Sequence, residues 1–145
     1  MIDTDAVIIT HGDVDGMVCA AQLIRLENSN YHLIFSNAKY VKNSLAQFLR
    51  ISDKPHRIYI SDIPANLKVA KILNELKKDG TQIFWIDHHP WEDGVKEQIE
   101  DFCNKVIYNA SLQTPAGVLM GRWLKEADPY YERIGNICYA YEKGT

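Results

Sequence analysis

Short apolar runs alternate with longer amphipathic segments along most of the chain. The short runs are rich in β-branched and aromatic residues, which is typical of strands buried in a sheet. Five of them predict strands at Ala6–Thr10, Tyr31–Ser36, Arg57–Ser61, Gln82–Ile86 and Lys105–Tyr108. Between and after them, apolar residues at helical spacing predict helices at Met17–Glu27, Val41–Arg50, Leu67–Asp79, Pro115–Glu126 and Tyr130–Tyr141. This alternation predicts an α/β fold with a doubly wound, mainly parallel sheet and helices on both faces.

Polar residues follow three of the predicted strands. They are His11, Asp13 and Asp15 after the first, Asp62 after the third, and Asp87, His88 and His89 after the fourth. The ligand crevice of a doubly wound sheet lies beyond the carboxyl ends of its strands. We therefore expect these three groups to meet at one rim, although they are far apart in the sequence.

Each of these groups also has an ordinary structural explanation. Asp13 and Asp15 are suited to capping the helix that follows them. Asp62 is typical of a turn, and a pair of histidines is common on protein surfaces. The combination favours a metal site, because several carboxylates packed together raise one another's pKa unless a cation is present. Carboxylate oxygens with imidazole nitrogens suit Mn²⁺, Mg²⁺ or Zn²⁺, and these loops contain no cysteine for a structural zinc site.

Three short segments resemble a known family. Thr-His-Gly-Asp-Val-Asp-Gly at 10–16, Ser-Asp-Ile-Pro at 61–64 and Ile-Asp-His-His-Pro at 86–90 are similar to the first three motifs of the DHH phosphoesterase superfamily. That superfamily includes RecJ-type nucleases, oligonucleotide and cyclic-dinucleotide phosphodiesterases, and exopolyphosphatases. The resemblance covers essentially the whole chain and implies one domain, residues 1–145, equivalent to the family's N-terminal catalytic domain.

The resemblance implies a centre of two manganese ions, with Mg²⁺ as the alternative. Its implied metal ligands are His11 and Asp13 for the first ion, Asp15 and His88 for the second, and Asp62 for both. His89 is implied to contact the scissile phosphate, and Asp87 to orient the histidine pair. The implied function is hydrolysis of a phosphodiester or phosphoanhydride, in a nucleotide, oligonucleotide or polyphosphate, by water activated between two metals.

The chain departs from the family pattern in three places. His11 stands two residues before Asp13, where many members have four. A fourth-motif aspartate is expected within Ile134–Glu142, where Tyr139 occupies the place or Glu142 substitutes. The smaller C-terminal substrate-binding domain has no counterpart here. The second and third departures are the basis of an alternative: a partly degenerate, non-catalytic module that binds metal or nucleotide and acts as a partner subunit.

The charge and composition of the chain indicate which ligands it can bind and in which cellular compartment it is found. The net charge of −3 leaves no broad basic surface for a nucleic-acid backbone, so attraction of an anion must be local or come from bound cations. We expect a phosphate-containing small molecule or a short single-stranded nucleic acid, with a homo-oligomer or a second chain completing the site. Three scattered cysteines and the lack of a membrane-length apolar run indicate a cytoplasmic protein. Trp85 is expected in the core, and Trp91 either stacks a base or packs over the rim.

Overall fold

The computed structural model describes residues 3–28 and 30–142, except for the side chain of Glu142. Within them the chain forms a five-stranded sheet in the order β2-β1-β3-β4-β5, and every neighbouring pair is parallel. The strands are β1 Ala6–Thr10, β2 Tyr31–Phe35, β3 Arg57–Ser61, β4 Gln82–Asp87 and β5 Lys105–Tyr108. The predicted α/β class is confirmed, and all five strand predictions agree with the structure to within one residue.

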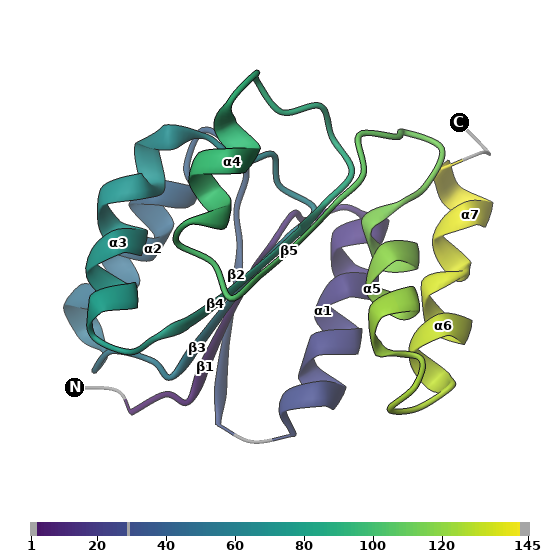
Figure 1. The fold of residues 1–145 in the computed structure, drawn as a ribbon. Helices are drawn as coiled ribbons and strands as arrows, with labels where there is room; N and C mark the ends of the chain where they lie inside the picture. Colours follow the sequence, from purple (N-terminus) through teal and green to yellow (C-terminus); the bar gives the residue numbers. More distant parts are fainter. Residues whose placement is uncertain (1–2, 29, 143–145) are drawn as a thin grey trace.

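Helices cover both faces of the sheet. They are α1 Val14–Glu27, α2 Val41–Ile51, α3 Ala70–Lys78 with the 3₁₀ turn Leu67–Val69 before it, α4 Val95–Glu100, α5 Ala116–Leu124, α6 Tyr130–Gly135 and α7 Ile137–Glu142. Helices α2, α3 and α4 lie on one face, and α1 and α5 lie on the other (Figure 1). Helices α6 and α7 pack on the outside of α1 and α5. No helix among the described residues is both long and apolar enough to cross a membrane.

Two helix predictions need correction. The segment Val95–Glu100 was not expected to be helical, but it forms α4. This helix has six residues and buries only Val95 and Ile99, so its periodicity is too short to recognise. The helix expected over Tyr130–Tyr141 is interrupted at Asn136, where α6 ends before α7 begins.

The core is divided between the two faces of the sheet. Under α2, α3 and α4 it is aliphatic, with Trp85 fully buried and its indole Nε1 donating to the carbonyl of Ile63 at 2.8 Å. Trp85 is therefore a core residue, as predicted. The face under α1 and α5 also contains buried polar side chains, among them Asp15 and Gln22. Asp15 lies where α1, α5 and α7 meet, whereas Gln22 donates to the carbonyls of Gly117 on α5 and Tyr131 on α6.

A hydrogen-bonded pair ties the ends of β1 and β3 together. The Ser61 hydroxyl donates to Thr10 Oγ1 at 2.9 Å, and Thr10 Oγ1 lies 3.1 Å from the carbonyl oxygens of both Gly16 and Ser61. Thr10 and Ser61 are fully buried, so these contacts are shielded from water. They hold the loop after β1 against the loop after β3.

Candidate metal centre

Three loops at the carboxyl ends of β1, β3 and β4 converge on the carboxylate of Asp62. Asp62 Oδ2 lies 3.9 Å from His11 Nδ1, and Asp62 Oδ1 lies 3.2 Å from His88 Nε2 and 3.9 Å from His89 Nδ1. This end of the molecule is at the top of Figure 1. The parallel sheet thus brings together residues separated by up to about eighty positions, as the strand pattern predicts.

Asp62 is buried without hydrogen-bond partners for its charge. The residue is 1% exposed, and within the described residues neither carboxylate oxygen accepts a hydrogen bond. Burial, followed by the neighbouring carboxylates of Asp13 and Asp15, raises the pKa of Asp62 far above its usual range. The backbone is in the left-handed region at φ 56, a conformation that aspartate adopts more readily than most residues. Such a buried, unsatisfied carboxylate is costly unless a cation compensates it.

Two sets of potential ligand atoms share Asp62. One consists of His11, Asp13 and Asp62, and the other of Asp62, His88 and His89. The ligand atoms within each set lie within 4.8 Å of one another. We call the first the outer group, because the side chains of His11 and Asp13 are 44% and 45% exposed. We call the second the inner group, because the side chain of His88 is 4% exposed.

The outer group is held by the first turn of α1. Asp13 caps this helix, its Oδ1 accepting from the N–H of Gly16 at 2.8 Å, while its Oδ2 lies 3.0 Å from His11 Nδ1. Burial acts to raise the pKa of Asp13, but contacts with Asp62, the Gly16 N–H and His11 outweigh it and lower this pKa. A Cβ atom on Gly16 would stand 1.8 Å from the carbonyl oxygen of His11, so only glycine allows this close approach. The capping interpretation of Asp13 is therefore confirmed, and it is compatible with metal ligation through Oδ2.

His88 has a partner for each of its ring nitrogens. Its Nδ1 lies 3.3 Å from the carbonyl of Ser111, and its Nε2 lies 3.2 Å from Asp62 Oδ1 and 3.3 Å from Asp15 Oδ2. A proton on Nδ1 donated to the carbonyl leaves the Nε2 lone pair facing the carboxylates. Metal-binding histidines commonly have such a second partner, which fixes the tautomer.

Asp15 lies beside the inner group but is engaged elsewhere. It is 2% exposed, and its Oδ2 and Oδ1 accept from the backbone N–H groups of Ala116 and Gly117 at 2.9 and 2.7 Å. Cys138 Sγ also lies 3.4 Å from Oδ1. Asp15 thus satisfies the N-terminus of α5 rather than that of its own helix, which corrects the expectation that it caps α1. Its predicted role as a metal ligand stays a prediction.

Asp87 contacts His89, one of the two histidines that it is implied to orient, and this orienting role stays a prediction. Asp87 is fully buried at the end of β4; its Oδ1 lies 2.7 Å from His89 Nδ1, and its Oδ2 accepts from the His89 N–H at 3.2 Å. The contact with Asp87 raises the pKa of His89. His89 also lines a cavity of ≈ 230 Å³ together with His11, Asn37, Ala38, Asp62, Ile63 and Pro64. The cavity gives His89 and the metal-ligand candidates a common opening to solvent.

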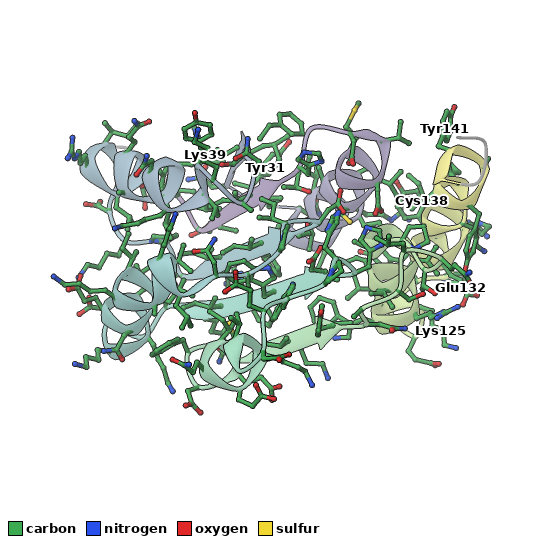
Figure 2. All side chains as sticks on the ribbon, turned by 90° about the horizontal axis from the view of Figure 1, so that it is seen from above. Tyr31, Lys39, Lys125, Glu132, Cys138 and Tyr141 are labelled. Atoms are coloured by element: carbon green, nitrogen blue, oxygen red, sulfur yellow. The ribbon has the colours of Figure 1, made fainter. Side chains whose placement is uncertain are left out.

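Several residues at the site were not found from the sequence. Asn37, from the loop after β2, lines the cavity, but no motif marks it. Trp91 packs against the core at the rim, which agrees with one of its two predicted roles. Its hydrogen bond from the indole to Asp87 was not predicted. Cys138, labelled in Figure 2, lies on the inner side of α7 and reaches Asp15 from the segment where an aspartate was expected. The side chain of Glu142, the proposed substitute, lies outside the described residues.

The comparisons with known proteins show the fold. No protein-family model matches the chain, and no curated protein matches it. A crystal structure of an exopolyphosphatase-related protein from Bacteroides fragilis superimposes with a TM-score of 0.56 at 16% sequence identity. The match covers 97% of this chain and 46% of that one, so the chain spans about half the length of its structural neighbour. At this identity the two proteins share an α/β fold.

Proposed function

We propose that this chain is a metal-dependent phosphohydrolase of the DHH phosphoesterase type. The observation that carries the proposal is the carboxylate of Asp62, which is buried, accepts no hydrogen bond from the described residues, and belongs to both ligand groups. One carboxylate shared by two sets of ligand atoms is suited to holding two divalent ions close together. The fold shared with an exopolyphosphatase-related protein supports the same class of chemistry.

The donor atoms fit manganese or magnesium. Each ligand group combines carboxylate oxygen with imidazole nitrogen and contains no sulfur. His11, Asp13 and Asp62 would hold one ion, and Asp62 and His88 the other, with Asp15 adjacent. When bound, two such ions supply a nucleophilic hydroxide at neutral pH and neutralise charge on the phosphoryl oxygens.

The protein's own residues orient the phosphate. When the imidazole is protonated, which the contact with Asp87 favours, Nδ1–H faces Asp87 and Nε2–H is left to donate to a phosphoryl oxygen in the cavity. Asp62 and His88 are held by burial, so the reacting groups need little rearrangement before reaction. The proposed substrate is a phosphodiester or phosphoanhydride in a nucleotide, oligonucleotide or polyphosphate. The residues described here would form the catalytic domain, because they match about half of the longer exopolyphosphatase-related chain.

Two observations at Asp15 favour the alternative of a module that binds metal or nucleotide without turnover. Both oxygens of Asp15 already accept backbone hydrogen bonds from α5. In addition, the described side chains of α6 and α7 bring a thiol, that of Cys138, to Asp15 rather than a carboxylate. A second ion would then have one anionic ligand fewer. Absence of turnover at saturating Mn²⁺, with metal binding intact, would favour this alternative over the enzyme.

The experiment that tests the proposal combines metal binding with hydrolysis. Mn²⁺ should raise the melting temperature of the chain, because a ligand that binds only the native state stabilises it by mass action. The chain should also hydrolyse bis(p-nitrophenyl) phosphate only with Mn²⁺ or Mg²⁺ present. Asp62→Asn should lose both effects, whereas Asp53→Asn, the same change at an exposed position, should keep them. A normal manganese-induced shift in Asp62→Asn would overturn the two-ion proposal.

A further inference from the structure

Among the described residues, the carboxylate of Asp87 makes three hydrogen-bonding contacts, and one of them comes from outside the motif. His89 supplies two through its ring Nδ1 and its backbone N–H. The third is the indole of Trp91, whose Nε1 donates to Asp87 Oδ2 at 2.7 Å. The indole bond is shorter than the 3.2 Å bond from the His89 backbone to the same oxygen. Trp91 therefore provides the closer of the two donors to this oxygen.

Trp91 is itself fixed by the sheet. Its backbone N–H donates to the hydroxyl of Tyr108 at 2.8 Å, and its ring stacks on the ring of Tyr108 with centroids 4.2 Å apart and planes inclined by 21°. The ring of Trp85 meets the ring of Trp91 edge-on, with the two ring centroids 6.0 Å apart. Tyr108 ends β5 and Trp85 lies within β4, so two neighbouring strands determine where the indole N–H points. The stack on Tyr108 uses one face of the Trp91 ring.

We infer that Trp91 is a positioning residue for the reaction, acting through Asp87 on His89. The indole N–H holds the plane of the Asp87 carboxylate, and the carboxylate holds His89 with Nε2 toward the cavity. Without this donor, Oδ2 of the fully buried carboxylate keeps, among the described residues, the longer backbone bond, so the plane of the carboxylate is fixed less firmly. This inference rests on the proposed function, since His89 matters only if a phosphate enters the cavity. Loss of an outer partner at metal centres typically costs 10–100-fold in activity or affinity.

The kinetic test uses Trp91→Phe, which keeps a ring for the stack on Tyr108 but removes the N–H. We expect kcat for bis(p-nitrophenyl) phosphate with Mn²⁺ to fall by about tenfold, while KM changes by less than about twofold. Trp123→Phe is the matched control, because Trp123 lies on α5 and packs on Phe84 away from this site. Equal kcat values for the two variants would overturn the inference. If Trp91→Phe does not fold, Tyr108→Phe removes the hydroxyl that anchors the Trp91 backbone and should lower kcat in the same direction.

A second measurement does not depend on turnover. In the ¹⁵N-labelled, metal-free chain of residues 1–145 at alkaline pH, the His89 ring nitrogens should show one dominant tautomer with the proton on Nδ1. In Trp91→Phe these signals should move toward tautomer averaging, as in Asp87→Asn, and in Trp123→Phe they should not move. An unchanged His89 spectrum in Trp91→Phe overturns the inference whatever happens to kcat. A parent chain that never hydrolyses the ester contradicts the proposed function, and the spectrum alone then decides the positioning role.

Discussion

The outer and inner groups share Asp62 but are built in opposite ways. His11 and Asp13 lie on the loop after β1, are nearly half exposed, and are held mainly by the cap on α1. His88 and His89 lie on the loop after β4, and each has a second partner, the Ser111 carbonyl for one and Asp87 for the other. Side chains fixed by second partners are held more precisely than side chains exposed on loops. The inner group should therefore matter for the stability of the fold, and the outer group mainly for ligand binding.

The largest effect should come from the glycine under the outer group. Gly16→Ala places a Cβ against the backbone carbonyl of His11, which cannot rotate away, and should lower the free energy of unfolding by roughly 3 kcal/mol or more. Gly12→Ala is the matched control, because its Cβ would meet no atom within 4 Å. We expect that control to stay within about 0.5 kcal/mol of the parent in urea unfolding. Similar losses in the two variants would show that the loop is not held as described.

The second-largest effect should distinguish the inner group from the outer group by their contributions to stability. His88→Ala removes a buried ring between Asp15 and Asp62 and should lower the metal-free free energy of unfolding by about 2 kcal/mol. His11→Ala changes an exposed side chain and should alter it by less than about 0.5 kcal/mol. Both variants should weaken Mn²⁺ binding in isothermal titration. A larger stability loss in His11→Ala than in His88→Ala would reverse the comparison.

Asp62→Asn should stabilise the metal-free chain while it abolishes the manganese response. The pKa of Asp62 is raised in the folded state, so its ionisation opposes folding: stability is fully present below the unfolded pKa and falls as the pH rises toward the folded value. Asparagine carries no charge to bury, and at pH 8 with a chelator we expect an increase on the order of 1 kcal/mol. Chemical denaturation at pH 5 and pH 8 measures this, and the gain should be larger at pH 8. A variant less stable than the parent at both pH values would contradict the assignment.

The smallest effect should be the pH dependence contributed by His89. Its pKa is raised by Asp87, so the pair stabilises the folded state below the unfolded histidine pKa of about 6.5 and loses this contribution as the pH rises through the folded value. Between pH 6 and pH 9, the metal-free parent should therefore lose more stability than His89→Gln. Parallel urea titrations of the two proteins provide the comparison. Identical pH profiles would mean that Asp87 does not favour the charged imidazole.

The sequence predicts the sheet and the meeting of the three loops well, for physical reasons. Runs such as Arg57–Ser61 end at residues that cannot continue a strand, and the rule for parallel sheets then places Asp62 beside the loop after β1. What the sequence leaves undetermined depends on side-chain direction and distant partners. The left-handed backbone of Asp62 and the indole bond from Trp91 to Asp87 exist only once neighbouring strands are packed. Asp15 is the clearest example of a residue whose partners the sequence does not predict, because the N–H groups that donate to its carboxylate belong to α5.

The bond between Asp15 and α5 also affects the order in which the protein can fold during its synthesis. The two hydrogen bonds join residues 101 and 102 positions apart in the chain. At roughly 5–20 residues per second, a ribosome adds the donors roughly 5–20 s after Asp15 has been incorporated. During that interval the aspartate must remain hydrated, so the first turn of α1 cannot reach its final buried state. The loop after β1 therefore reaches its final set of contacts only after α5 has been synthesised.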